Sequence, residues 1–201
     1  MKGVSLAWVM MAAAIASSCQ SSIDLTSVWD NRPILPTSHH SQMARVTRVV
    51  SGHTIEVQPT LHATTLNQTV RLIGIQAPDQ GQSPWGPEAQ AYLESLLLGE
   101  TVQLSWADEL DDGEAQQRLA AEGVDSYGRQ WAYVWLNGQL VNQQLISDGV
   151  VLAEERSPHL QYVQHFNHAQ HRARILGLGV WHPDHPMRQT PREFRQQQDR
   201  L

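Results

Sequence analysis

Cysteine is almost absent from this chain of 201 residues, since Cys19 is the only one. A single cysteine excludes an internal disulfide. The length is sufficient for one domain with its own apolar core plus extensions, and a hydrophobic content of 41% is ordinary for a globular protein. The composition therefore predicts one globular domain without an internal disulfide bond.

Lysine is equally scarce, because Lys2 is the only one and the other 13 of the 14 cationic residues are arginine. Guanidinium groups are planar, bidentate donors that suit phosphate or carboxylate partners. The formal net charge is −6, which opposes binding to nucleic acid over the whole surface. Any nucleic-acid binding must therefore come from a local cluster of arginines.

The sequence also lacks an apolar run as long as the roughly 20 residues that span a bilayer. The N-terminus "MKGVSLAWVMMAAAIASSC" has one cation, a shorter apolar run and small residues before Cys19. This pattern predicts a secretory signal over residues 1–18. "ASSC" resembles a loose bacterial lipobox, which predicts lipidation of Cys19 and attachment to a membrane through a lipid anchor; an ordinary cleaved signal with an incidental cysteine is the alternative. Either reading predicts an exported protein, in the cell envelope or secreted.

Residues 19–42 are rich in Ser, Thr and Pro and are interpreted as a linker. From residue 43 to residue 182 the pattern becomes that of a folded domain. Stretches rich in β-branched residues and bounded by turn residues predict strands, and apolar residues at helical spacing predict helices. The predicted strands cover 45–50, 53–58, 68–75, 101–106 and 129–138, and the predicted helices cover 86–100, 139–149 and 159–177.

This order of elements predicts an α+β fold that is mainly a β-barrel, closed and small, with the helices packed outside it, as in the oligonucleotide/oligosaccharide-binding (OB) architecture. The turn between the first two strands is expected at Ser51-Gly52, with His53 directly after it. The last segment, 183–201, is polar and rich in Gln and Arg, and it is predicted to be a disordered tail.

The acidic stretch "DELDDG" in residues 107–126 invites comparison with a calcium-binding loop. Leu110 stands where the third oxygen ligand belongs, and Leu119 stands where the bidentate glutamate belongs. The comparison fails, and a solvated loop is the favoured interpretation.

One group of histidines and one group of tryptophans are interpreted as structural. The histidines are spaced three residues apart in the helix, so they point in different directions around it, which favours a solvated face over a metal site. The tryptophans could stack on bases, but their places in strands favour packing in or around the core. These residues are His165, His168 and His171, and Trp106, Trp131, Trp135 and Trp181.

Three stretches together resemble the staphylococcal nuclease (thermonuclease) family: "SGHT" at 51–54, "VRLIGIQAPD" at 70–79 and "DSYGRQWAYVW" at 125–135. The resemblance implies a five-stranded OB-fold barrel with three helices. It also implies hydrolysis of phosphodiester bonds in DNA and RNA, usually with calcium. No single stretch is decisive, but they occur in the family's order.

The resemblance places three catalytic residues in this chain. The family's two phosphate-binding arginines fall on Arg71 and Arg129, and its general-base glutamate falls on Asp79, which is one methylene shorter. Guanidiniums hold the phosphate and stabilise the charge of the transition state, and a carboxylate activates water. For Arg71 a purely structural ion pair is the alternative.

The metal positions depart from the family. Where the family has two calcium-binding aspartates, this chain has His53 and Gln76. Calcium affinity depends on the charge of the ligands, and imidazole suits zinc, nickel or copper better than calcium. A turn histidine that serves only the backbone is the alternative for His53.

The sequence thus predicts a thermonuclease-like endonuclease that acts on nucleic acid, with weak activity or an altered metal. The alternative is a catalytically inactive binding module at the cell envelope. The acidic charge favours the alternative, whereas Arg71, Asp79 and Arg129 together favour the enzyme.

Overall fold

The protein is described as a computed structural model over residues 41–60, 66–106, 127–154 and 162–200. The predicted signal over 1–18, Cys19, most of the linker and the acidic stretch 107–126 lie outside the described residues. Within those residues, no helix is sufficiently long and apolar to cross a membrane.

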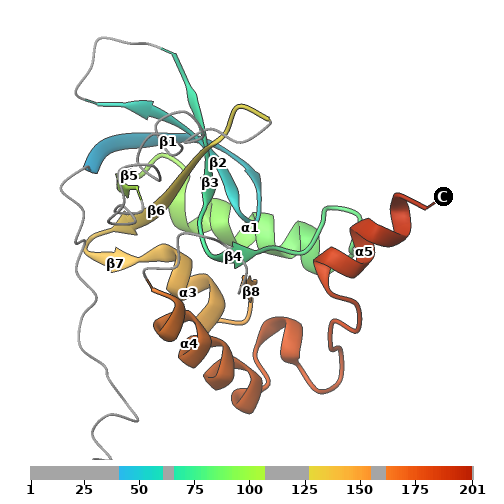
Figure 1. The fold of residues 1–201 in the computed structure, drawn as a ribbon. Helices are drawn as coiled ribbons and strands as arrows, with labels where there is room; N and C mark the ends of the chain where they lie inside the picture. The colour runs from blue at the N-terminus through green and yellow to red at the C-terminus, as the bar shows by residue number, and fades with distance from the viewer. Residues whose placement is uncertain (1–40, 61–65, 107–126, 155–161, 201) are drawn as a thin grey trace, which may run out of the picture. The chain divides into compact units, whose positions relative to one another are not determined.

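Five strands close a barrel (Figure 1). They run in the order β3-β2-β1-β5-β6, and the parallel pairing of β3 with β6 closes the circle. The strands are β1 (Ser41–Ser51), β2 (Thr54–Pro59), β3 (Gln68–Leu72), β5 (Thr101–Ser105) and β6 (Gln130–Leu136). The predicted five-stranded OB-type barrel is thereby confirmed.

Three short strands complete the sheets. β7 (Gln139–Leu140) follows β6 through a tight turn in which Asn137 and Gly138 have positive φ, as expected for this hairpin. β4 (Ile75–Gln76) pairs with β8 (Leu152–Ala153) in a separate small sheet.

The turn between β1 and β2 differs by one residue from the prediction. Ser51 pairs with Thr54, so the two turn residues are Gly52 and His53, and His53 lies inside the turn. Gly52 is held against neighbouring elements, because a Cβ there would lie 2.7 Å from the Cβ of Ala89 and 3.0 Å from that of Ala77. This packing fixes the position from which His53 projects.

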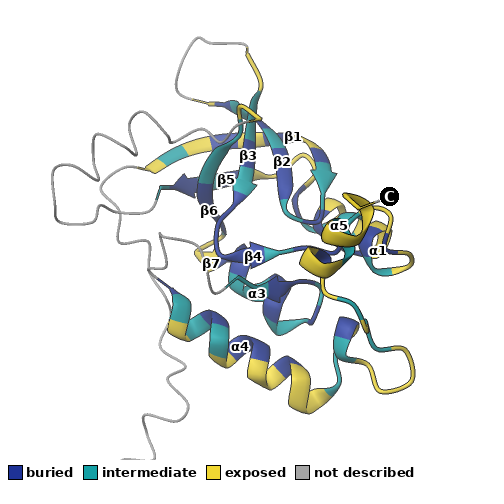
Figure 2. Cartoon of the chain, turned by 45° about the vertical axis from the view of Figure 1, so that its right-hand side comes forward, coloured by how far each residue is buried: buried dark blue, intermediate teal, exposed yellow. Residues whose placement is uncertain are grey.

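The described residues contain four α-helices instead of three: α1 (Trp85–Leu97), α3 (Val141–Ser147), α4 (Val163–Leu176) and α5 (Pro191–Gln198). The first three match the predicted helices, and Gly99, Gly149 and Gly177 follow or cap their C-termini with positive φ. α1 contacts β1, and α3 contacts β6 and α4. Figure 2 shows α4 with buried residues on one side and exposed residues on the other.

The expected disordered tail instead forms helix α5. Thr190 caps the helix by accepting a hydrogen bond from the Glu193 N–H, the Glu193 carboxylate accepts one from the Thr190 N–H, and Pro191 occupies the first turn. This reciprocal capping box satisfies donors that would otherwise remain unpaired. Local capping therefore overrides the polar composition of the segment.

The core fills the barrel and extends beneath it to α3 and α4. Trp135 is buried, and its indole N–H donates to the Ser105 hydroxyl at 2.8 Å. Trp106 and Trp131 pack against this core, which agrees with the structural interpretation of these residues. His168 and His171 are exposed on α4, as expected for a solvated face.

Asn142 is the buried polar side chain that joins the barrel to α3. Its Nδ2 donates to the Ile73 carbonyl at 2.8 Å, and its Oδ1 accepts from the Val134 N–H at 3.0 Å. Ile73 directly follows β3 and Val134 lies in β6, so both bonds connect α3 to the barrel wall.

Replacing Asn142 by alanine is expected to lower the free energy of unfolding by roughly 2–4 kcal/mol, because each buried group left unpaired costs about 1–3 kcal/mol. Urea unfolding measures the change, with Gln143→Ala on the same helix as the control. Equal stabilities of the two variants would show that the Asn142 bonds contribute no stability.

Candidate functional site

Arg71 lies on β3 between two core residues. Val70 and Leu72 are fully buried, so the strand alternation turns Arg71 to the opposite face. Its backbone pairs with Thr54 of β2 on one side and with Trp131 of β6 on the other. Arg71 therefore sits where three strands of the barrel meet.

The Arg71 guanidinium has an ion-pair partner that the sequence did not reveal. Its Nη2 lies 3.5 Å from Oε2 of Glu154, which directly follows β8. The two side chains are 17% and 33% exposed, respectively. An ion pair of the kind that the structural alternative requires is therefore present, and part of the Arg71 side chain remains accessible to solvent.

Arg129 directly precedes β6, at the end of the strand that pairs with β3. It is half-buried, and its guanidinium lies 5.1 Å from the ring centre of the exposed Tyr127. A cation over an aromatic face is attracted by the quadrupole of the ring. The parallel register brings Arg129 to the same edge of the barrel as Arg71.

The imidazole of His53 is held in its neutral form. Burial, and after it the positive charges of Arg71, Arg129 and Arg195, together lower its pKa from 6.5 to about 3. The imidazole is therefore neutral at physiological pH. Its Nδ1 is buried without a hydrogen-bond partner in the described part of the chain, while its carbonyl accepts from the Leu72 N–H at 2.9 Å.

Gln76 and Asp79 lie on the segment that follows β3. Gln76 is half-buried in β4, where its backbone pairs with Leu152. The Asp79 carboxylate accepts from the Gly81 N–H at 3.0 Å, and the Asp79 N–H donates to the side chain of Gln82. The orientation of Asp79 is therefore set by hydrogen bonds within its own loop. Ala77 of the same segment packs against Gly52 of the turn that carries His53.

The residues at these positions do not fit calcium. They offer one carboxylate, one amide and one imidazole whose pKa the charges of three arginines help to lower, and calcium requires several anionic oxygens. Among the described residues, no group of three or more His, Cys, Asp or Glu side chains converges as a metal site would require. The donor set favours an anion over a cation.

Arg195 of α5 is a second residue that the sequence did not reveal. The segment was expected to be disordered, so its arginines could not be placed. The [ST]-x-x-[DE] pattern of "TPRE" at 190–193 was the available signal for a helix at this point.

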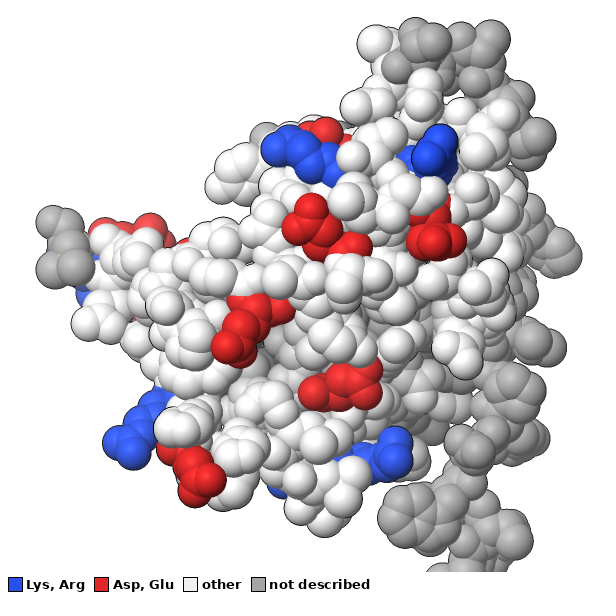
Figure 3. All heavy atoms as spheres, turned by 180° about the vertical axis from the view of Figure 1, so that it is seen from behind, with Lys and Arg blue, Asp and Glu red and all other residues white. Residues whose placement is uncertain are grey.

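The face shown in Figure 3 has no continuous cationic track. Acidic side chains are spread across it, and the arginines lie apart from one another near its margins. Such a mixture does not attract a polyanion. This face therefore offers no extended surface for a nucleic-acid backbone.

The lowered pKa of His53 predicts a pH-dependent stability. Between pH 6.5 and pH 3 the unfolded chain binds a proton at His53 and the folded protein does not, so the free energy of unfolding falls as the pH decreases through this range. The slope from one such group is at most about 1.4 kcal/mol per pH unit. Urea unfolding at pH 7.5 and pH 5.5 measures it.

His53→Gln is the matched variant, because it removes the titrating group and retains a polar side chain. The variant is expected to lose less stability than the parent between the two pH values. Identical losses in parent and variant would exclude a depressed pKa at His53.

Comparison with known proteins places these residues in a family context. The pattern of the family described as "Staphylococcal nuclease homologue" matches residues 69–183. The chain is 28% identical over 147 residues to the thermonuclease of Staphylococcus hyicus, covering 71% of this chain and 77% of that protein. It is 28% identical over 141 residues to the thermonuclease of Staphylococcus intermedius, covering 68% and 74% of the two chains.

A third similar protein is an uncharacterized endonuclease of Haemophilus influenzae. It is 26% identical over 162 residues, which cover 80% of this chain and 77% of that protein. The match of the family pattern spans more than half of the chain and contains Arg71, Asp79 and Arg129.

Proposed function

The chain belongs to the family of staphylococcal nuclease homologues, and from this premise we propose that it binds nucleic acid and hydrolyses its phosphodiester bonds as an endonuclease. The observation that carries the proposal is the approach of Arg71 and Arg129 to one edge of the barrel, where both charges act on His53. The names of the similar proteins, two thermonucleases and an endonuclease, support the same substrate class.

The chemistry that these residues supply is binding and proton transfer. Arg71 and Arg129 donate hydrogen bonds to the non-bridging oxygens of the phosphate and stabilise the charge that develops there. Asp79 accepts the proton of the attacking water as the oxygen–phosphorus bond forms. The ester bond to the sugar oxygen then breaks, and that oxygen takes a proton from solvent.

Three features of the site predict slow hydrolysis. Asp79 reaches less far than a glutamate would, and Glu154 competes with the phosphate for Arg71. The residues at positions 53 and 76 provide no anionic ligand for a metal ion. The family's usual rate is therefore not expected of this chain.

Digestion of plasmid DNA and RNA by the purified protein tests the proposal, with calcium, magnesium, manganese or zinc, or with chelator. Slow fragmentation that Arg129→Ala abolishes supports hydrolysis at this site. Fragmentation that persists in Arg129→Ala would point to another site or a contaminant.

A catalytically inactive binding module is the second candidate function. The positive charges of Arg71 and Arg129 beside a neutral His53 favour it, because an anion can bind there without any chemical step. Nucleotide binding that Arg129→Ala weakens, together with no cleavage under any of these conditions, would establish this alternative.

We also propose that the protein is exported and anchored through a lipid on Cys19, on the strength of the N-terminal sequence. Cys19→Ser is expected to move the protein from the membrane fraction to the soluble fraction, measured by fractionation and mass spectrometry of the mature N-terminus. A parent protein that is already soluble with an unmodified N-terminus contradicts the anchor.

A further inference from the structure

The loop that carries Asp79 holds this residue at three of its polar groups. The carboxylate accepts a hydrogen bond from the Gly81 N–H at 3.0 Å, and the carbonyl accepts one from the Gln82 N–H at 2.8 Å. The Asp79 N–H donates to Oε1 of the Gln82 side chain at 2.9 Å. Gly86 lies against the same Asp79 carbonyl, because a Cβ on Gly86 would be 2.0 Å from its oxygen. Gln82 therefore bonds Asp79 through both its backbone and its side chain.

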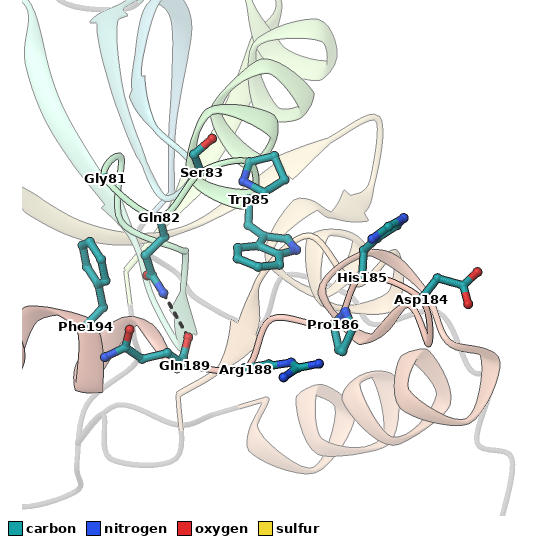
Figure 4. Close-up of a pocket in the computed structure, with 11 residues that line it drawn as sticks. Gly81, Gln82, Ser83, Trp85, Asp184, His185, Pro186, Arg188, Gln189 and Phe194 are labelled. Atoms are coloured by element: carbon teal, nitrogen blue, oxygen red, sulfur yellow. Dashed lines mark hydrogen bonds between the residues drawn. The ribbon is translucent and has the colours of Figure 1, made fainter.

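The Gln82 side chain also reaches the C-terminal segment. Gln82 is only 5% exposed, and its Nε2 donates to the Gln189 carbonyl at 3.0 Å (Figure 4). Gln189 directly precedes Thr190, which caps α5. One buried amide thus joins the Asp79 backbone to the start of α5, and both ends of the amide have a partner, as buried polar groups require.

Helix α5 makes a second contact with this loop. A Cβ on Gly81 would lie 3.1 Å from the Phe194 ring, so the ring packs against the residue whose N–H bonds the Asp79 carboxylate (Figure 4). A pocket of about 540 Å³ lies between the loop and the C-terminal segment. The C-terminal segment therefore contacts both residues that bond Asp79, one by a hydrogen bond and one by packing.

The segment that leads to α5 is attached to the domain at an independent point. The Val180 N–H donates to the Gly149 carbonyl, and the Met187 N–H donates to the Val180 carbonyl, both at 2.8 Å. A Cβ on Gly179 would lie 2.2 Å from the Gly149 carbonyl oxygen. Because this backbone contact leaves no room for a side chain, the chain before α5 has little freedom to move away from the domain.

We propose that Gln82 is a positioning residue for Asp79, and that α5 keeps it in place through the Gln189 carbonyl and the Phe194 ring. The inference rests on the proposed function, because it concerns the orientation of the general base of that site. Residues 184–200 lie beyond the match of the family pattern, which ends at residue 183. The resemblance to the family therefore assigns no role to this segment.

The orientation of Asp79 matters because its side chain is short. Displacement of a catalytic group by about 1 Å can reduce a rate roughly a hundred-fold, and a site on a loop needs support from its neighbours. The Gly81 N–H bonds Oδ1 of Asp79, and no described residue bonds Oδ2. Oδ2 can therefore accept the proton of the attacking water while Oδ1 fixes the direction of the carboxylate.

Two variants break the two contacts separately. Gln82→Glu retains an oxygen for the Asp79 N–H but loses the donor to the Gln189 carbonyl, whose oxygen repels the new carboxylate. Phe194→Ala removes the ring that packs against Gly81 and leaves the Gln82 side chain unchanged. The second variant keeps the test valid if a glutamate at position 82 prevents folding.

Amide hydrogen exchange of the purified protein, followed by nuclear magnetic resonance, tests the proposal without reference to activity. Both variants are expected to raise the exchange rates of the Asp79 and Gly81 amides about ten-fold. The Val134 amide in β6 should exchange at the rate of the parent within about two-fold, because the barrel is not altered. Gln196→Ala, an exposed change on α5, is the matched control and should resemble the parent throughout.

Cleavage kinetics supply the second measurement. In both variants kcat is expected to fall roughly ten- to a hundred-fold, because the carboxylate no longer holds one orientation toward water. KM should stay within about two-fold of the parent, since Arg71 and Arg129 still bind the phosphate. A merely structural role of α5 would not separate kcat from KM in this way.

The outcomes distinguish the inference from the proposed function. Asp79 and Gly81 amides that exchange as in Gln196→Ala would overturn the inference, and so would faster exchange that includes the Val134 amide to the same extent. Faster exchange confined to the loop, with kcat equal to that of an active parent, would also overturn it. Faster exchange confined to the loop of a parent that cleaves nothing supports the positioning of Asp79 and contradicts the proposed function alone.

Discussion

Arg129→Ala is expected to weaken binding of a nucleoside 3′,5′-bisphosphate by about 1.5–3 kcal/mol, or roughly ten- to a hundred-fold, because it removes a charged hydrogen bond to phosphate. Any cleavage of nucleic acid should fall at least as far, since the same guanidinium faces the charge that develops during hydrolysis. Arg129 precedes β6 and lies outside the core, so the thermal midpoint should remain near that of the parent. Calorimetry and thermal unfolding measure the two effects separately.

Arg71→Ala provides the contrasting variant. Loss of the Arg71 guanidinium leaves the partly buried Glu154 without its ion-pair partner. Both the affinity for the bisphosphate and the free energy of unfolding should therefore decrease. Arg172→Ala, an exposed change on α4, is the control for loss of one positive charge. Unchanged bisphosphate affinity in both Arg129→Ala and Arg71→Ala would remove these arginines from phosphate binding.

The barrel could be predicted from the sequence because its signals are local. Each strand is a short β-branched run bounded by turn residues, and the Asn137-Gly138 hairpin needs only its own two residues. The turn at Gly52 and His53 was misplaced by one residue because its register depends on the pairing of Ser51 with Thr54. The hydrophobic pattern of the two strands does not by itself determine which residues occupy the turn between them.

The sequence indicated the candidate arginines of the barrel strands but not the residues that contact them from later segments. Arg71 and Arg129 stand in stretches that resemble a known family, so the sequence could assign them. Glu154 lies far along the chain from Arg71, and only the pairing of β4 with β8 brings it to that arginine. Contacts of this kind depend on tertiary structure and leave no periodic signal.

The departures at positions 53 and 76 acquire a physical meaning from the structure. A buried turn residue on which arginine charges act is a poor place for a cation, and a neutral imidazole there avoids the repulsion that a protonated one would meet. Replacing both positions by carboxylates reverses this balance, since it adds two negative charges close to Asp79.

The variant His53→Asp with Gln76→Asp is expected to bind calcium with a dissociation constant of about 10⁻⁴–10⁻³ M, in the range of weakly charged oxygen sites, where the parent binds none measurably. The reason is that calcium prefers several anionic oxygens, and the variant offers three carboxylates where the parent offers one. The aspartate at position 53 also fits a two-residue turn, which tolerates this side chain. Calorimetric titration with calcium measures the gain, and His53→Asn with Gln76→Asn is the control of similar size without charge.

Calcium-stimulated cleavage of DNA should appear in the same double variant, because the arginines that bind phosphate are already present. If calcium binds while cleavage stays absent, the short reach of Asp79 is the remaining cause, and Asp79→Glu in the double variant should restore it. Cleavage that stays absent in the triple variant would show that the reach of Asp79 is not the cause. If the double variant binds calcium no better than its asparagine control, positions 53 and 76 do not face a common point, and the transfer of the family's metal positions onto this chain is wrong.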